Sequence, residues 1–176
     1  MIDLKKFDEN LKKISEEIEN KVGKINLDEI PSCEFKLSEY EKLDIFSSTT
    51  KEGIYIFYIQ KKSLDKFEEK WGNKIERYSP KIIKDRIKHH QEHSNLKEWI
   101  PLYIGKSEKV KSRIEEHITK KKESTTSSMK LREREKFDND NFAVKIIPLE
   151  TNHYGFVSHY VESVLRDKVK PIVGKK

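Results

Sequence analysis

Residues 53–59 form one continuous apolar run, Gly53-Ile54-Tyr55-Ile56-Phe57-Tyr58-Ile59. The run is too short for a helix and is rich in β-branched and aromatic side chains, so it predicts a strand that is covered on both faces. Two other segments have the same character, and they are Pro101-Leu102-Tyr103-Ile104-Gly105 and Phe142-Ala143-Val144-Lys145-Ile146-Ile147. The sequence therefore predicts three strands.

Helical patterns follow these strands. Apolar residues recur four positions apart at Val110, Ile114 and Ile118, and Ser107 can cap the helix that they predict. A last helix is expected over about residues 156–169, where apolar residues again fall on one side. Together with the strands, these helices predict an α+β fold, an α/β sandwich in which a small three-stranded sheet is flanked by helices.

A polar segment at about residues 61–99 separates the first two strands. It predicts two helices, near Leu64–Trp71 and Pro80–His93, with a break at Gly72-Asn73. We therefore expect a helical insertion between the first two strands of the sheet.

The first 50 residues are expected to form a helical N-terminal appendage to a domain over residues 51–176. Apolar residues spaced three and four apart predict one helix that stops at Gly23. They are Leu4, Phe7, Leu11, Ile14 and Ile18. This narrow stripe could pair with a second copy to form a homodimer, or pack on its own domain. We favour the second, because fewer than three heptads rarely suffice alone. After a break at Pro31-Ser32, a capping-box pattern at Ser38 and Glu41 predicts a short helix with Tyr40, Leu43 and Phe46.

Charge is abundant and unevenly distributed. The chain has 39% charged residues and a net charge of +6. Residues 1–50 hold 8 Lys against 12 acidic residues, a net of −4, whereas residues 51–176 hold 29 basic against 19 acidic residues, a net of +10. This distribution favours a polyanionic partner on the C-terminal two-thirds, although a solvated lysine-rich surface would give the same composition.

Several classes of protein are excluded. Leu, Ile, Val and Phe together number 47 of 176 residues, enough for a folded core. The single Cys33 excludes an internal disulfide and a Cys-rich zinc site. No apolar run approaches the ~18 residues of a membrane span, and there is no signal-peptide pattern. We therefore expect a cytoplasmic protein without membrane contact.

One constellation is more specific than the composition. It consists of Gly53-Ile54-Tyr55, Tyr103-Ile104-Gly105-Lys106-Ser107, Arg113, His117 and Glu162. This pattern resembles the GIY-YIG nuclease family, whose name is spelled by residues 53–55 and 103–105. The order Gly-x-Ser, five residues, Arg, three residues, His also fits, as does a Glu on a helix that ends in a proline. The resemblance covers residues 53–174 apart from the insertion, and it implies a mainly antiparallel sheet.

The sequence departs from the family pattern in two places. Tyr55 and Tyr103 are 103−55=48 residues apart, whereas most members join these strands by a short turn. Pro171 is followed by Ile172, where many members have Asn. The second difference concerns a supporting contact near the site.

The resemblance implies a set of catalytic roles. Glu162 would be the sole protein ligand of one Mg²⁺ or Mn²⁺ ion, for which a hard oxygen is suitable. Tyr55 would be the general base, and nearby Arg113 and Lys106 would favour its phenolate form. Arg113 would also stabilise the phosphate in the transition state, while Tyr103 and His117 would position water, base or phosphate. We expect no small-molecule cofactor.

These residues also have structural interpretations. Tyr55 and Tyr103 could be core aromatics, and Arg113 and Glu162 could be solvated helix residues. The joint pattern favours a divalent-metal-dependent DNA endonuclease of the restriction type, because the length leaves no room for a separate DNA-binding domain. A homing- or repair-type nuclease of the same family, or a non-catalytic nucleic-acid-binding module on the same scaffold, are the alternatives.

Two basic segments are candidates for contact with double-stranded DNA. The first lies in the insertion and comprises Lys81, Lys84, Arg86 and Lys88. The second comprises Lys120, Lys121, Lys122, Lys130, Arg132 and Arg134. Both could instead be hydrophilic surface. In the insertion His89 and His93 are four residues apart and could bind a metal. Because no third ligand is in view, we favour the interpretation that His89, His90 and His93 are solvated or contact DNA.

Overall fold

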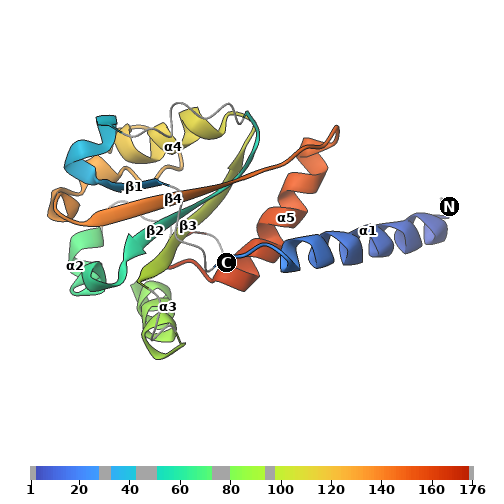
Figure 1. Cartoon of the computed structure of the whole chain (residues 1–176), viewed down its shortest axis with the longest axis horizontal. Helices are drawn as coiled ribbons and strands as arrows, with labels where there is room; N and C mark the ends of the chain where they lie inside the picture. Colours follow the sequence, from blue (N-terminus) through green and yellow to red (C-terminus); the bar gives the residue numbers. More distant parts are fainter. Residues whose placement is uncertain (1–2, 28–32, 43–50, 73–79, 94–97, 175–176) are drawn as a thin grey trace.

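A computed structural model describes residues 3–27, 33–42, 51–72, 80–93 and 98–174. The described residues form an antiparallel sheet of four strands in the order β1-β4-β2-β3. The strands are β1 (Cys33–Lys36), β2 (Gly53–Gln60), β3 (Trp99–Ser107) and β4 (Asn141–Pro148). Helices lie on both faces of this sheet (Figure 1), which confirms the predicted α+β class.

The prediction of three strands was wrong by one. Residues 33–36 form an edge strand that pairs with β4, with Phe35 opposite Phe142. Only Phe35 of its four residues is buried, so the segment is too short and too polar to carry a strand pattern of its own. The pairing with β4, made across about a hundred residues of sequence, gives it this conformation.

The helices agree with the sequence pattern. They are α1 (Lys5–Gly23), α2 (Phe67–Trp71), α3 (Pro80–His93), α4 (Val110–Thr119) and α5 (Tyr154–Val169). Short 3-10 turns occupy Leu37–Lys42, Lys61–Leu64, Leu131–Glu133 and Glu135–Phe137. Tyr40 lies in the first of these turns, whereas Leu43 and Phe46 of the predicted short helix lie outside the described residues. Among the described helices none has the length and apolar character to cross a membrane.

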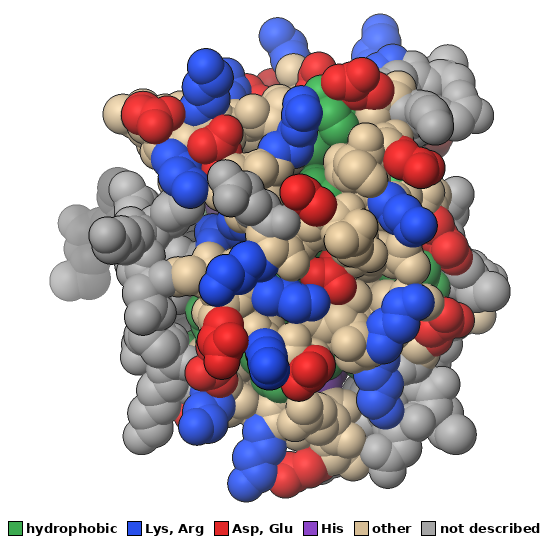
Figure 2. Space-filling view, turned by 90° about the vertical axis from the view of Figure 1, so that its left-hand side faces the viewer, with side chains coloured by type: hydrophobic (Ala, Val, Ile, Leu, Met, Phe, Trp, Pro, Cys, Tyr) green, Lys and Arg blue, Asp and Glu red, His purple; other side chains and the backbone are tan. Residues whose placement is uncertain are grey.

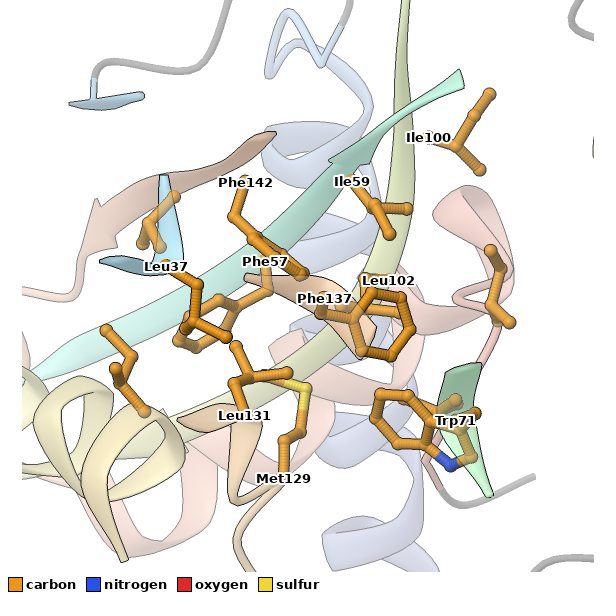
Figure 3. Packing of buried hydrophobic residues seen from close by; sticks show 14 of the residues in the cluster. Leu37, Phe57, Ile59, Trp71, Ile100, Leu102, Met129, Leu131, Phe137 and Phe142 are labelled. Carbon is orange, nitrogen blue, oxygen red and sulfur yellow. The ribbon is translucent and has the colours of Figure 1, made fainter. Parts of the chain in front are cut away.

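The two faces of β2 contribute to two separate hydrophobic cores. Tyr55, Phe57 and Ile59 point to one side, where they pack with α4 and with the segment after it. Figure 3 shows Phe57 in this core beside Leu131 and Met129. Ile54, Ile56 and Tyr58 point to the other side, against α5. The alternation follows from the period of two along a strand, and it places Tyr55 on the α4 side.

Helix α1 extends away from the sheet (Figure 1). Only Val22 in its last turn is buried, and Tyr160 of α5 donates a hydrogen bond to Glu19 at 2.7 Å. The predicted stripe is therefore covered only towards its C-terminal end. Leu4, Phe7 and Ile14 are exposed to 53%, 56% and 45%.

Helix α3 of the insertion is tied to the C-terminal segment 170–174. The Arg86 guanidinium donates to the carbonyl groups of Ile172 and Gly174, and His90 Nε2 lies 2.7 Å from the Lys170 carbonyl oxygen. That segment in turn donates backbone hydrogen bonds to β3, at Pro101 and Leu102. The insertion thus supports the outer edge of the strand that carries Tyr103.

Candidate functional site

The site is organised around the pairing of β2 and β3. Tyr55 lies opposite Gly105, and Phe57 lies opposite Tyr103. The rings of Tyr55 and Tyr103 stack with centroids 6.3 Å apart. A Cβ atom at Gly105 would lie 2.4 Å from the Tyr55 hydroxyl oxygen, so only glycine leaves room for that oxygen across β3. The absence of a side chain at Gly105 therefore gives the Tyr55 hydroxyl group its space.

Helix α4 brings His117 to this tyrosine. The hydroxyl oxygen of Tyr55 lies 3.0 Å from His117 Nε2, and the backbone N–H of Met129 donates to His117 Nδ1 at 3.0 Å. Because Nδ1 accepts a hydrogen bond, the single proton of a neutral imidazole must be on Nε2. His117 therefore donates to the oxygen of Tyr55. This arrangement favours the phenolate form of Tyr55.

Burial has opposite effects on the pKa values of the two side chains. His117 has a pKa well below its usual value, first because burial disfavours the imidazolium and second because Arg113 is positive. Burial and the neighbouring Tyr103 raise the pKa of Tyr55 well above its usual value, while the charge and hydrogen bonding of Arg113 lower it. At neutral pH the pair therefore consists of a neutral imidazole and a protonated phenol.

Arg113 lies on α4, one turn before His117, and is half-buried. Its guanidinium donates to Glu116 Oε2 at 2.5 Å and to the Ser127 carbonyl oxygen at 2.7 Å. The serine-rich segment 124–128 therefore lies against Arg113, and residue 129 lies against His117. Tyr55 and His117 are 1% and 0% exposed.

A groove of about 490 Å³ is lined by Arg113, whose guanidinium also interacts with Tyr55. It runs between the first turns of α4 and α5, and both Lys106 and Arg113 line it. Glu108 and Glu116 line it too, so its lining carries charges of both signs. Of the predicted catalytic residues, Lys106 and Arg113 line this groove, whereas Tyr55, Tyr103, His117 and Glu162 do not.

Glu162 is on α5 and forms an ion pair with Arg166 at 2.5 Å, with side chains 15% and 18% exposed. Its charge contributes to the raised pKa of Tyr55, although it is the smallest of the contributions, so the two side chains are within electrostatic reach. Among the described residues there is no group of three or more His, Cys, Asp or Glu side chains that could hold a metal. A single half-buried carboxylate fits one Mg²⁺ or Mn²⁺ ion whose remaining ligands are waters and phosphate oxygens.

The basic residues predicted to contact DNA fall into two groups. Lys84, Lys88, Lys121, Lys122 and Arg132 are exposed, and Lys120 is half-buried. Lys130 and Arg134 are each only 5% exposed, and Arg86 is half-buried against the C-terminal segment. The side chains of Lys81 and His93 lie outside the described residues. The rings of His89 and His90 are 5.6 Å apart. On the face seen in Figure 2 basic and acidic side chains are interspersed.

Four partners of the site were not identified from the sequence. They are Glu116, Ser127, Met129 and Arg166. Glu116 and Arg166 are three and four residues from the groups that they bind, so helical spacing could have indicated them. Ser127 and Met129 contribute backbone groups, which leave no pattern in a sequence.

Comparisons of the chain with protein-family models, with curated proteins and with solved structures give no significant match.

Proposed function

We propose that this chain is a divalent-metal-dependent DNA endonuclease of the restriction type, with an active site like that of the GIY-YIG nucleases. The observation that carries the proposal is the hydrogen-bonded pair of Tyr55 and His117, 62 positions apart in the sequence, formed where Gly105 leaves space for the phenol. A packed core does not require this combination. Hydrolysis of a phosphodiester does require a base held in place beside a cation.

In this proposal Tyr55 is the general base. The Nε2–H group of His117 donates to the tyrosine oxygen and so stabilises the phenolate, as does the positive charge of Arg113. Because burial raises the pKa of Tyr55, the phenolate is a minor species at neutral pH but a strong base once formed. Tyr103, whose ring centroid is 4.6 Å from that of His117, orients the pair or the phosphate.

Arg113 and Lys106 receive the phosphate in this proposal. Both line the groove between α4 and α5, and Arg113 also interacts with Tyr55. A guanidinium can give two hydrogen bonds to a phosphate at once, which suits the charge that develops in the transition state. Arg113 would exchange its contacts with Glu116 and Ser127 for the phosphate.

Glu162 would hold the metal ion. A bound Mg²⁺ or Mn²⁺ ion supplies positive charge to the leaving oxygen and polarises the phosphate. Arg166 holds the carboxylate in place through an ion pair until then.

The exposed basic side chains of segment 120–132 and of α3 would contact the DNA backbone.

Cleavage of both strands by a chain with one site calls for two copies. We expect the copies to associate through α1 in antiparallel orientation. Residues 5–14 hold four Lys and two acids, net +2, whereas residues 15–23 hold three Glu and one Lys, net −2, so each half would face its complement.

Plasmid cleavage tests the proposal. The chain is incubated with a supercoiled plasmid of varied sequence in Mg²⁺ or in Mn²⁺, beside Glu162→Gln and the matched control Asp167→Asn, which removes an exposed acid of the same helix. We expect linear product with wild type and with the control, and none with Glu162→Gln. Intact plasmid in both metals with wild type would refute the nuclease proposal.

Sequencing of the product ends distinguishes the restriction type from its nearest alternative. Double-strand breaks at one sequence support the restriction type, whereas nicks favour a homing- or repair-type enzyme.

The almost complete burial of Tyr55 and His117 favours a second candidate, a non-catalytic DNA-binding module. Salt-dependent DNA binding without metal-dependent cleavage would select that candidate.

A further inference from the structure

Two cations of the second basic segment are buried. Lys130 and Arg134 are 5% exposed, although both lie in a segment that is mostly polar and charged. A buried charge is tolerated only where it is paired or hydrogen-bonded. The partners of these two side chains therefore indicate what the segment does.

Arg134 holds the carbonyl group of Met129. Its Nε donates to the Met129 carbonyl oxygen at 3.0 Å, and a terminal N–H donates to the Trp71 carbonyl oxygen. The guanidinium also lies over the Trp71 ring, with Cζ 3.6 Å from the ring centroid. A planar guanidinium with several fixed donors can make these three contacts together, whereas an ammonium group cannot.

The same residue, Met129, contacts the candidate site. Its N–H donates to His117 Nδ1 at 3.0 Å, while its side chain packs in the core beside Leu131 (Figure 3). Lys130 fixes the preceding segment, because its Nζ donates to the carbonyl oxygens of Lys122 and Ser124 at 2.9 and 2.6 Å. Met129 is thus anchored by its side chain, its carbonyl group and the next residue.

The donor at Nδ1 decides what His117 can do. A carboxylate at that position would keep a proton on Nδ1 and leave Nε2 free to accept the proton of Tyr55, as in a catalytic triad. A backbone N–H that donates to Nδ1 requires the opposite arrangement, with no proton on Nδ1 and the proton on Nε2. While the Met129 hydrogen bond stands, His117 is a hydrogen-bond donor to Tyr55 and is not its base.

We propose that Arg134 is a positioning residue that acts through the backbone of Met129 to hold His117 in the Nε2–H tautomer facing Tyr55. Arg134 therefore belongs to the support of the site and not to the DNA-contacting surface. The consequence for catalysis rests on the proposed nuclease function, whereas the consequence for the tautomer does not.

Nitrogen-15 NMR of the histidine rings tests the tautomer in the full chain. We expect the His117 ring of wild type to carry its proton on Nε2, with a correlation across the hydrogen bond from the Met129 N–H to Nδ1. In Arg134→Lys we expect a mixture of tautomers and loss of that correlation. The matched control is Arg132→Lys, because Arg132 is two residues away, exposed and in contact with Tyr40. That control should resemble wild type.

Two results would overturn the proposal. One is a proton on Nδ1 of His117 in the wild type, which is decisive even if Arg134→Lys fails to fold. The other is a folded Arg134→Lys variant with the tautomer of the wild type.

Cleavage kinetics give a separate reading. We expect kcat of Arg134→Lys to fall about tenfold with KM unchanged, the size typical for a group that orients a catalytic residue. A rise in KM with kcat unchanged would assign Arg134 to DNA binding instead and overturn the proposal. If wild type cuts no DNA, the nuclease function fails, and the NMR result still decides the role of Arg134.

Discussion

A Cβ atom at Gly105 would lie 2.4 Å from the hydroxyl oxygen and 2.6 Å from Cζ of Tyr55. Neither atom can move away easily, because Tyr55 is 1% exposed and its oxygen is hydrogen-bonded to His117. The two residues are paired across β2 and β3, so the requirement for glycine comes from a tertiary contact and not from a turn.

Gly105→Ala should therefore displace the Tyr55 phenol. We expect the free energy of unfolding to fall by about 1–3 kcal/mol from overpacking, and plasmid cleavage to slow by about 100-fold from the misplaced hydroxyl. Chemical denaturation and a cleavage time course measure the two effects. Gly23→Ala is the control, because a Cβ at Gly23 meets nothing within 4 Å and Gly23 lies outside the groove. A variant Gly105→Ala with the stability and activity of the control would contradict the argument.

The buried neutral His117 should make stability depend on pH. Its pKa in the folded state is below the unfolded value of about 6.5, so below that pH the unfolded chain binds a proton that the folded chain does not. The free energy of unfolding should then fall as the pH decreases from about 6.5, with a slope of up to about 1.4 kcal/mol per pH unit.

Denaturant titrations between neutral and acidic pH measure this slope. The contribution should be absent in His117→Gln, which cannot titrate, and should remain in His159→Gln, which removes an exposed histidine. Equal slopes in wild type and His117→Gln would mean that His117 is not neutral in the fold.

The exposed stripe of α1 should determine the oligomeric state. Phe7 is 56% exposed in a single chain, and an antiparallel partner helix would cover it. Phe7→Lys should therefore give a monomer where wild type is a dimer, as measured by sedimentation velocity over a series of concentrations. Asn20→Lys, on the same helix but outside the stripe, should leave the dimer intact. A monomeric wild type at all concentrations would exclude this interface.

The exposed lysines of the second basic segment should determine the salt dependence of DNA binding. Lys121 and Lys122 are exposed, and each contact with a phosphate adds about 0.9 to the slope of log K against log salt. Replacing both by Gln should lower the slope by about 1.8. Replacing exposed Lys24 and Lys36 by Gln makes the same change in charge outside the basic segments and should leave the slope unchanged. Equal changes of slope in the two double variants would mean that DNA binding is not localised to the second basic segment.

Much of the fold could be predicted from local pattern. The apolar run at residues 53–59 predicted β2, and the spacing of Val110, Ile114 and Ile118 predicted α4 with its buried side. Both signals are strong because each element buries a regular set of side chains. Strand β1 was missed because its four residues carry no such regularity, and pairing with β4 supplies its hydrogen bonds.

The basic segments show where pattern is insufficient. Lysine and arginine look alike in a sequence whether they are exposed or buried. Arg132 and Arg134 are two residues apart, yet the first is exposed and the second is enclosed by Trp71 and the Met129 carbonyl group. Backbone curvature in the turn at residues 131–133 decides between the two, and no residue type encodes it.

The sequence by itself determined the α+β class, the strands that carry Tyr55 and Tyr103, and the helix that presents Arg113 and His117 on neighbouring turns, because these depend on local periodicity. The tertiary structure alone decided that Tyr55 and His117 meet and that Gly105 makes room for them. It also decided that a backbone N–H determines the histidine tautomer. These features depend on distances between groups far apart in the chain and on backbone atoms that every residue shares.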